Sequence, residues 1–375
     1  MKHQIAFVGG QLLPVFFGIK EFNPDTIHFI VSEESKGNIT TLKSFLSGKV
    51  FSEIVCDPFD FISLKSTCES IINRIPPENE VQFNLTGGTK IMVLAAQSLI
   101  SEGKGTGFYV NQNDTLLQIP AYQIRKHNAR ITAKEFFEVS GHKLNNSKSI
   151  NDFSKDDFTA AREIEAFATS EDAMFYGITS SIRKKYDRLD KLPPSGRMNI
   201  NLAEIKRSVK LSWDSNGILL ESAGNNIFGI QSPNAKSLFF NAVWWELIVA
   251  KEISRWPKAT ELLIHCELPF KTSTKTPKNE IDILINLGGK LIFVECKSGL
   301  VKQEDINKMK VVKDTYGGIV SRAILVSRFK PHPTIIEKCS EVNIDLFYLY
   351  DAKNQINPIG KLIPLLDRVE KKLMI

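Results

Sequence analysis

The sequence predicts an α/β protein with two sheet-containing domains and a mixed α/β region between them. Two observations lead to this prediction: apolar and amphipathic stretches alternate through residues 1–125, and a Gly288-Gly289 pair joins two apolar runs much later in the chain. Alternating strands and helices are typical of a doubly wound, mostly parallel sheet. Because the periodicity blurs over residues 126–235, we expect domains over 1–125 and 236–375. Residues 126–235 are then a connecting region, for which a winged-helix-like fold is one candidate.

The N-terminal domain is expected to begin with a buried strand that ends in glycines, and to finish with an edge hairpin around Asn113-Asp114. Ligands of doubly wound sheets bind at the carboxyl ends of the strands. The loops that follow the strands are therefore the expected place for a ligand site. The expected strands are 4–10, 26–32, 51–56, 81–85, 107–111 and 116–119, and the expected helices are 11–20, 37–46, 59–75 and 91–101.

A dense group of basic residues lies in the connecting region, after a helix expected over residues 158–175. A basic run of this kind is most often a solvated helix face, with phosphate contact as the alternative. Turns at Asn216-Gly217 and Asn225-Asn226 are expected in the hairpins that follow. The basic residues, which surround Tyr186, are Arg183, Lys184, Lys185, Arg188 and Lys191.

The C-terminal domain is organised around residues 279–298, where the two glycines form the loop of a predicted β-hairpin. In that register Asp282 faces Glu295, and Glu280 faces Lys297. Facing side chains have Cβ atoms roughly 5 Å apart, so the two carboxylates repel each other unless a cation or a proton lies between them. A divalent metal ion held by Asp282 and Glu295, with Lys297 beside them to orient water or stabilise charge, is the pattern of a hydrolytic site. The alternative is an exposed hairpin face with a salt bridge between Glu280 and Lys297.

The rest of this domain continues as a mixed α/β pattern. Three polar residues on the first helix after the hairpin, Gln303, Lys308 and Lys310, could contact substrate phosphates, although a helix surface explains them equally well. The expected helices are 303–316 and 334–339, and the expected strands are 319–327 and 345–349.

Composition sets only broad limits on function. The 48 Lys and Arg residues against 42 Asp and Glu give a net charge of +6, which permits a polyanionic partner without requiring one. The five cysteines are scattered without C-x-x-C spacing, and the chain starts without the pattern of a secretory leader. No apolar run approaches the roughly 20 residues that span a bilayer. We therefore expect a reduced, cytoplasmic protein with no membrane role.

The hairpin residues also carry a family resemblance. Asp282 followed by a strand and then Glu295-Cys296-Lys297 resembles the PD-(D/E)xK nuclease motif. In that superfamily a helix ahead of the hairpin often supplies another acid, and the resemblance assigns this position to Glu246. It also implies a restriction-endonuclease-like fold for the C-terminal domain.

A second motif, Asn84-Leu-Thr-Gly-Gly-Thr-Lys90, joins a predicted strand to a helix. Such a turn offers backbone N–H groups and the positive end of a helix dipole to a phosphate. Its spacing is neither that of a P-loop nor that of a dinucleotide fingerprint, and a purely structural turn with Thr86 or Thr89 as N-cap is the alternative.

The same motif resembles the signature of CARF domains, the sensors of CRISPR-associated effectors. The resemblance implies a side-by-side dimer that holds a cyclic oligoadenylate across its two-fold axis. The matching positions are Thr86, Gly87, Gly88, Thr89 and Lys90, and the rim positions assigned by place alone are Gly9, Gly10, Gln11, Ser32 and Glu33.

Together the two motifs resemble the CARF plus PD-(D/E)xK ancillary nucleases of type III CRISPR systems. The resemblance implies a homodimeric nuclease that cleaves DNA or RNA, single strands being expected, and is activated by a cyclic oligoadenylate, most plausibly cyclic tetra-adenylate. Asp282 and Glu295 would hold Mg²⁺ or Mn²⁺, and Glu246 and Lys297 would complete the site. Two alternatives stay open: a ligand-responsive nucleic-acid-binding regulator with a vestigial nuclease domain, and a restriction or repair nuclease that senses another nucleotide.

Overall fold

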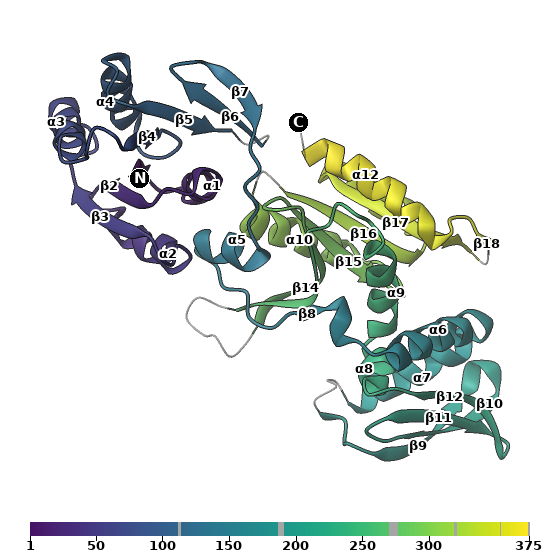
Figure 1. Cartoon of the computed structure of the whole chain (residues 1–375). Coiled ribbons are helices and arrows are strands. Elements are labelled where there is room, and N and C mark those ends of the chain that lie inside the picture. The colour runs from purple at the N-terminus through teal and green to yellow at the C-terminus, as the bar shows by residue number, and fades with distance from the viewer. Residues whose placement is uncertain (112–113, 187–190, 270–276, 319–320, 353, 374–375) are drawn as a thin grey trace.

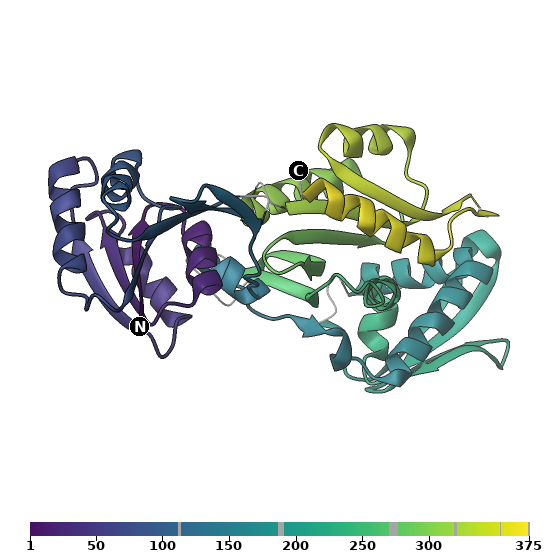
Figure 2. The same cartoon turned by 45° about the horizontal axis from the view of Figure 1, so that its top comes forward.

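The described residues form three β-sheets with helices packed on their faces. Figures 1 and 2 show an elongated molecule, with the N-terminal sheet at one end, the C-terminal sheet in the middle and a small antiparallel sheet at the other end. None of the helices within the described ranges is long and apolar enough to cross a membrane. The computed structural model describes residues 1–111, 114–186, 191–269, 277–318, 321–352 and 354–373.

The N-terminal sheet has the order β3-β2-β1-β4-β5-β6-β7, in which β1 to β5 are parallel and the last two strands antiparallel. The doubly wound sheet predicted from the sequence is confirmed. The strands are β1 (Lys2–Val8), β2 (Thr26–Val31), β3 (Val50–Val55), β4 (Glu80–Asn84), β5 (Thr106–Val110), β6 (Thr115–Ile119) and β7 (Gln123–Lys126). Helices α1 (Leu13–Phe22) and α2 (Ile39–Ser44) belong to one apolar core, and α3 (Phe61–Ile72) and α4 (Lys90–Ser101) to another on the opposite face.

The edge hairpin of β5 and β6 is also as predicted, although Asn113 of its expected turn lies outside the described residues. Strand β7 was not predicted. Its four residues, Gln123–Lys126, are mostly exposed, so they lack the apolar alternation that signals a half-buried strand.

The connecting region is folded rather than a simple linker, and from residue 155 onward its apolar core is continuous with that of the C-terminal domain. A four-stranded antiparallel meander packs against helices α6 (Lys155–Ser170), α7 (Asp172–Lys185) and α8 (Ala235–Phe240), and this is not the winged-helix-like fold named as a candidate. The mixed α/β character expected for the region is present. The meander strands are β9 (Gly196–Leu202), β10 (Arg207–Trp213), β11 (Gly217–Ser222) and β12 (Asn225–Gln231).

Two local predictions in this region are wrong. The single helix expected over residues 158–175 is two helices, because Glu171 has a non-helical backbone between α6 and α7. Helix α6 also begins earlier than expected, at a capping box formed by Ser154 and Asp157. The second hairpin turn lies at Ala223-Gly224, where both residues have positive φ as a tight turn demands, and not at Asn225-Asn226, which begin β12.

The C-terminal sheet has the order β18-β17-β16-β15-β14-β13-β8, with β15, β16 and β17 parallel. Helices α9 (Val243–Ile253) and α12 (Leu362–Leu373) cover one face, and α10 (Gln303–Val312) and α11 (Pro333–Glu341) cover the other. The helix predicted over 303–316 continues past α10 only as one π-helical turn, Lys313–Gly317. The strands are β8 (Lys148–Ser149), β13 (Glu261–Pro269), β14 (Pro277–Asn286), β15 (Leu291–Lys297), β16 (Ser321–Phe329), β17 (Ile344–Asp351) and β18 (Asn354–Gln355).

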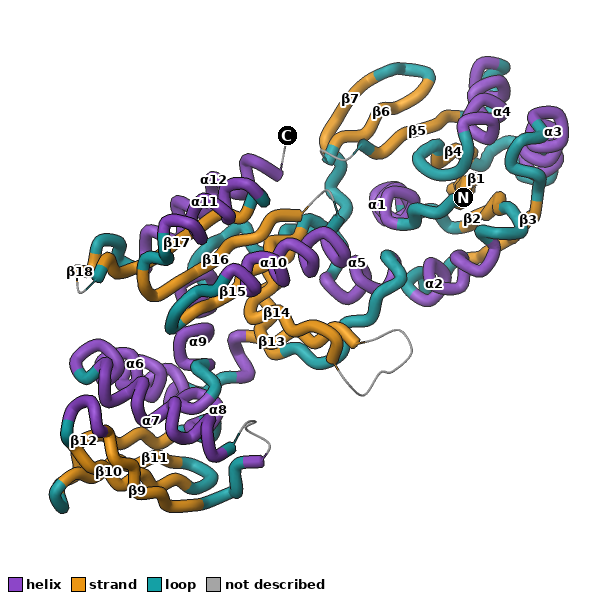
Figure 3. Tube along the Cα trace, turned by 180° about the vertical axis from the view of Figure 1, so that it is seen from behind, coloured by secondary structure: helices purple, strands orange, loops and turns teal. Residues whose placement is uncertain are grey.

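A single apolar core joins the two large domains. Helix α5 (Ala133–Val139) lies between the α1 and α2 side of the N-terminal sheet and the α10 side of the C-terminal sheet, as Figures 1 and 3 show. Phe136 and Phe137 on α5 belong to one buried cluster with Phe16 of α1 and Ile306 of α10. The domains therefore share buried side chains instead of meeting only at polar surfaces.

Asn286, at the end of β14, ties the hairpin of β14 and β15 to the chain that leaves the N-terminal domain. Its side-chain amide donates to the carbonyl of Ile131 at 2.7 Å, and its oxygen accepts from the N–H groups of Gly288 and Gly289 at 2.9 and 2.7 Å. The residue is buried. Every one of these partners loses a hydrogen bond if the amide is removed.

We expect Asn286→Ala to lower the free energy of unfolding by about 2–4 kcal/mol, because buried polar groups left unpaired each cost on the order of 1–3 kcal/mol. Chemical denaturation monitored by circular dichroism measures this change. Asn201→Ala, at an exposed asparagine on β9, is the matched control and should change stability by less than about 0.5 kcal/mol. Equal effects of the two substitutions would contradict the anchoring role of Asn286.

Candidate functional site

The hairpin predicted to carry catalytic residues has the predicted register. Ile283 pairs with Val294 and Ile285 with Ile292, and the N–H of Leu287 donates to the carbonyl of Lys290. Past the Ile283–Val294 pair the two strands open. In that opening the N–H of Cys296 donates to Asp282 Oδ2 at 2.7 Å. The Asp282 carboxylate is thus fixed at the point where the ladder ends, opposite Glu295.

Three carboxyl groups from three elements meet at this opening: Glu246 from α9, Asp282 from β14 and Glu295 from β15. Burial raises the pKa of Glu246 well above its usual value, and the charges of Glu280 and Glu295 raise it further. Burial, together with Glu246 and Glu295, likewise raises the pKa of Asp282. The structure therefore brings together the three acids singled out in the sequence. Without a cation, burial and mutual repulsion disfavour the charged forms of Glu246 and Asp282.

This donor set fits a small divalent cation. Mg²⁺ prefers carboxylate oxygens, and a cation among the three carboxyls would offset the repulsion that helps to raise the pKa values of Glu246 and Asp282. Within the described ranges, no three His, Cys, Asp or Glu side chains already stand close enough to enclose a metal ion. The residues thus include suitable metal ligands, but their side chains would have to move closer together to coordinate an ion.

Sequence reasoning missed His265, which contacts Glu246. His265 Nε2 lies 2.5 Å from Glu246 Oε2, and His265 has a left-handed backbone (φ 54°) in the middle of β13. Burial lowers the pKa of His265, although Glu280 and Asp282 act in the opposite direction. Because burial also favours the neutral form of Glu246, we describe the contact as a hydrogen bond between uncharged groups and not as an ion pair. Only a lone histidine in an apolar run marked this position in the sequence.

Lys297 forms salt bridges with Glu295 at 2.9 Å and with Asp305 at 3.1 Å. The salt bridge with Glu280, which would have indicated an ordinary hairpin surface, is absent from this described pair of strands. Burial alone would lower the pKa of Lys297, but Glu295 and Asp305 raise it above its usual value. The ammonium therefore stays charged beside the carboxyl groups.

Asp305 was also missed from the sequence, although its spacing gave a signal. It is the third residue of α10, where it accepts the N–H of Lys302 at 2.8 Å in a capping-box arrangement. The same carboxylate group therefore starts the helix and holds Lys297. Lys308, one turn further along α10, borders a small hollow with Glu280 and Glu295, whereas Lys310 is paired with Asp314.

In the second predicted site, both threonine hydroxyls have structural partners. Thr86 Oγ1 accepts the N–H of Val110 at 3.0 Å, which extends the β4–β5 pairing by one contact. Thr89 Oγ1 donates to the carbonyl of Pro58 at 2.6 Å and accepts from Met92 N at 3.3 Å as the N-cap of α4. The structural role considered for this turn is thus present. The N–H groups of Thr86 and Thr89 are also bonded within the chain, to Asn84 Oδ1 at 3.2 Å and to Met92 Sδ at 3.4 Å.

The glycines of this turn are required by close packing. A Cβ at Gly87 would lie 2.3 Å from the carbonyl oxygen of Phe7, and Gly88 has a φ of 77°. A Cβ at Gly9 would lie 3.2 Å from Gly88 N, so the loops after β1 and β4 adjoin, as predicted. Lys90 is exposed, and its ammonium forms no hydrogen bond or salt bridge within the described part of the chain. Its ammonium is therefore free to meet an anion.

The other predicted rim residues lie at the same edge of the sheet but differ in what their polar groups contact. Ser32 N donates to Ser35 Oγ at 2.9 Å, and Glu33 forms an exposed salt bridge with Lys36. Gly10 and Gln11 line a cavity of about 500 Å³ that the C-terminal domain also lines, through residues that include Gly289 and Lys290 of the β14–β15 turn. The loop after β1 thus faces the turn of the hairpin across this cavity.

Comparisons with known proteins bear on both domains. Residues 4–136 match the family model described as the Card1 CARF domain, so the N-terminal domain is a CARF domain and the resemblance noted in its sequence is confirmed. The comparison with curated protein sequences finds no match.

Three solved structures share the fold of this chain at low sequence identity. Protein VC1899 from Vibrio cholerae has a TM-score of 0.69 at 16% identity, covering 99% of this chain and 98% of its own. Can2 from Sulfobacillus thermosulfidooxidans, in complex with cyclic tetra-adenylate, has a TM-score of 0.65 at 18% identity, covering 98% and 99%. A type III CRISPR defence DNA nuclease activated by cyclic oligoadenylate has a TM-score of 0.56 at 15% identity, covering 98% of this chain and 51% of its own. The fold is therefore shared over nearly the whole chain.

Proposed function

We propose that this CARF-domain protein is a metal-dependent nuclease that a cyclic oligoadenylate switches on in type III CRISPR defence. The observation that carries the proposal is the buried group of Glu246, Asp282 and Glu295, with the charged Lys297 beside it, at the open end of a hairpin. The pKa values of Glu246 and Asp282 are raised by burial and by neighbouring carboxylates, and strongly shifted pKa values of this kind cluster at functional sites. The fold shared with Can2, whose structure holds cyclic tetra-adenylate, supports that ring as the activator.

Asp282 and Glu295 would hold Mg²⁺ or Mn²⁺, and Glu246 would complete the set. When bound, such an ion withdraws charge from a phosphodiester and lowers the pKa of a water molecule. The Lys297 ammonium, kept charged by Glu295 and Asp305, would orient the attacking water or stabilise the negative charge that develops on the phosphate. His265 would fix the orientation of the Glu246 carboxyl through its hydrogen bond.

The activator would bind at the carboxyl edge of the N-terminal sheet in a homodimer, with the ring across the two-fold axis. The N–H groups at the start of α4 and the free Lys90 ammonium suit a phosphate. Gly10, Gln11, Ser32, Glu33 and the Thr86 to Thr89 turn would border the same ligand. The proposed substrate is DNA or RNA.

We expect Lys90→Ala to weaken the binding of cyclic tetra-adenylate by about ten- to a hundredfold, because a charge-assisted contact is worth roughly 1.5–3 kcal/mol. Isothermal titration calorimetry measures the affinity. Lys126→Ala removes the same charge from the exposed edge strand β7 and should leave the affinity unchanged. Normal binding by Lys90→Ala would mean that the turn has a structural role only.

The cleavage assay separates this proposal from its alternatives. Full-length protein is incubated with Mn²⁺ and labelled single-stranded DNA or RNA, with and without cyclic tetra-adenylate. We expect cleavage only when both metal and ring are present. Ring-dependent binding of nucleic acid without cleavage would support a regulator with a vestigial nuclease domain, and cleavage that ignores the ring would support a nuclease that senses another nucleotide.

A further inference from the structure

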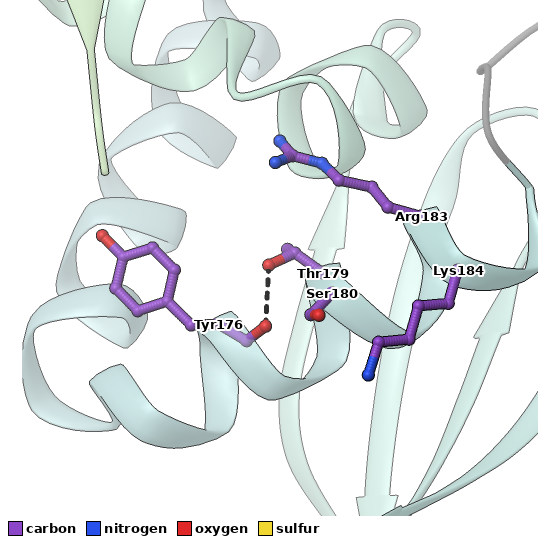
Figure 4. A pocket seen from close by; sticks show the side chains of 5 residues that line it. All are labelled: Tyr176, Thr179, Ser180, Arg183 and Lys184. Carbon is purple, nitrogen blue, oxygen red and sulfur yellow. Dashed lines mark hydrogen bonds between the residues drawn. The ribbon is translucent and has the colours of Figure 1, made fainter. Parts of the chain in front are cut away.

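One face of α7 leads directly away from the catalytic hairpin. Five of its residues, Tyr176, Thr179, Ser180, Arg183 and Lys184, line a hollow of about 380 Å³, which Figure 4 shows at close range. They recur at helical spacing, so their side chains lie along one stripe of the helix. The stripe has Tyr176 at one end and two cations at the other.

The Tyr176 end of the stripe touches the catalytic strand. The Tyr176 hydroxyl donates to the carbonyl of Ser298 at 2.7 Å, and Ser298 directly follows Lys297. Arg328, buried at the end of the neighbouring strand β16, reaches the same hydroxyl at 3.5 Å and donates to Thr169 Oγ1 at 2.7 Å. Arg328 Nε is buried without a hydrogen-bond partner in the described part of the protein. The junction of α7 with the hairpin therefore holds a buried guanidinium, with the Glu165 carboxyl also within its electrostatic reach.

The other end of the stripe carries uncompensated positive charge. Arg183 and Lys184 are exposed and form no salt bridge within the described ranges, and the Ser180 hydroxyl between them and Tyr176 is exposed as well. Asp172, the acid that acts on Tyr176, lies at the opposite, N-terminal end of α7. The hollow thus presents hydroxyl and cationic donors with no carboxylate among its lining residues.

We propose that this face of α7 holds the phosphodiester backbone of the nucleic-acid substrate on its way out of the catalytic site, with Arg183 and Lys184 each contacting a phosphate. The inference rests on the proposed nuclease function and adds a substrate path to it. Lysine, arginine and hydroxyl side chains are the usual partners of phosphates and read no sequence. The path therefore accepts strands without sequence preference.

The length of the stripe fixes which substrates can use it. Arg183 and Lys184 lie about 10–12 Å along the helix from Tyr176, at 1.5 Å per residue. One strand of DNA rises by about 3.4 Å per nucleotide along its axis, so a stacked strand covers the stripe with about three nucleotides beyond the cut and a more extended strand with fewer. A dinucleotide reaches the catalytic hairpin but not Arg183 or Lys184.

The test compares three single substitutions on the same helix, each of which removes one positive charge: Arg183→Gln, Lys184→Gln and the control Lys185→Gln. Lys185 lies outside the hollow, with its ammonium over the Tyr186 ring. Full-length protein with Mn²⁺ and cyclic tetra-adenylate is given long single-stranded DNA, RNA of the same sequence, or a dinucleotide. Binding of the long strands is followed by fluorescence anisotropy at several salt concentrations.

Arg183→Gln and Lys184→Gln should each weaken binding of the long strands by about three- to tenfold and lower the salt slope by about one. KM for long strands should rise, with kcat and dinucleotide hydrolysis unchanged, and Lys185→Gln should match the parent protein. The DNA and RNA arms identify which backbone uses the path. Equal loss in Lys185→Gln, or unchanged binding in the Arg183→Gln, Lys184→Gln double variant, overturns the proposal. If the parent protein binds strands through these residues but cleaves nothing, the path stands and the proposed nuclease function fails.

Discussion

Asp282→Asn is expected to reduce metal-dependent cleavage by at least about a thousandfold, equivalent to about 4 kcal/mol of transition-state stabilisation. The substitution keeps an oxygen that can accept the Cys296 N–H but removes one of the three charges that would hold the ion. Because it also relieves repulsion from Glu246 and Glu295, the free energy of unfolding without metal should stay equal or rise slightly. Glu295→Gln should behave in the same way.

Two measurements separate lost catalysis from lost folding. Cleavage of single-stranded DNA and RNA is measured with Mn²⁺ and cyclic tetra-adenylate, and melting temperature is measured with and without Mn²⁺ alone. A metal that binds only the folded state raises the melting temperature, so Mn²⁺ should stabilise the parent protein and not Asp282→Asn. Asp351→Asn, at an exposed acid in the same sheet, should keep both responses. Full cleavage by Asp282→Asn would rule out the hairpin as the catalytic site.

Cyclic tetra-adenylate is expected to raise the cleavage rate of the full-length protein by several orders of magnitude. A shift from about 1% to 99% of the competent arrangement requires about 5.5 kcal/mol of differential binding. A ring that contacts the Thr86 to Lys90 turns of both subunits makes two sets of contacts, and both can contribute to this difference in binding free energy. Equal activity with and without the ring, at saturating metal, would leave a nuclease with no switch.

The geometry gives this switch a short route. A Cβ at Gly289, in the hairpin turn, would lie 2.2 Å from Phe17 Cζ on α1, and a Cβ at Gly288 would lie 2.0 Å from the Arg130 side chain. The buried Lys290, next in the chain, forms a salt bridge with Asp114 at 2.8 Å. The turn of the β14–β15 hairpin is therefore seated on the CARF domain, and α1 begins directly after the Gly10-Gln11 loop.

Gly289→Ala should reduce activation by at least about tenfold while leaving the affinity for cyclic tetra-adenylate nearly unchanged, because the new methyl group separates the hairpin from Phe17. Gly224→Ala is the matched control, since Gly224 also has positive φ in a hairpin turn but has no neighbour within 4 Å of the added atom. Phe17→Ala tests the same contact from the sensor side if Gly289→Ala folds poorly. Normal activation in both Gly289→Ala and Phe17→Ala would exclude this route.

Local signals in the sequence were sufficient for the hairpin register, because two glycines between apolar runs leave few alternatives and fix which residues face each other. They were also sufficient for the turn after β4, whose glycines meet steric limits set by Phe7. His265 could not be found in this way, because its contact with Glu246 depends on how β13 and α9 pack. Asp305 is an intermediate case, since its helix-capping position is a local signal but its salt bridge with Lys297 depends on tertiary packing.

The domain boundaries were the feature of the fold that the sequence predicted least well. Strand β8 and helix α6 precede the connecting meander in the chain but pack with β13 and α9 of the C-terminal domain. Such non-local packing leaves no periodic trace in either segment. A fragment that starts near residue 237 would lack both elements, and for this reason the activation experiment uses the full chain.

The apolar core that runs through α5 limits how this protein can be rearranged in evolution. Two domains joined by an exposed linker can be exchanged by recombination, because few side chains have to match across the junction. Here Phe136, Phe137 and their neighbours pack against both large domains at once, so an N-terminal domain taken from another protein would meet a C-terminal surface shaped for different side chains. Successful exchanges should therefore carry α5 together with the helix faces on both sides of it, and new ring specificities should arise more readily by substitution at the exposed sheet edge than by replacement of the whole domain.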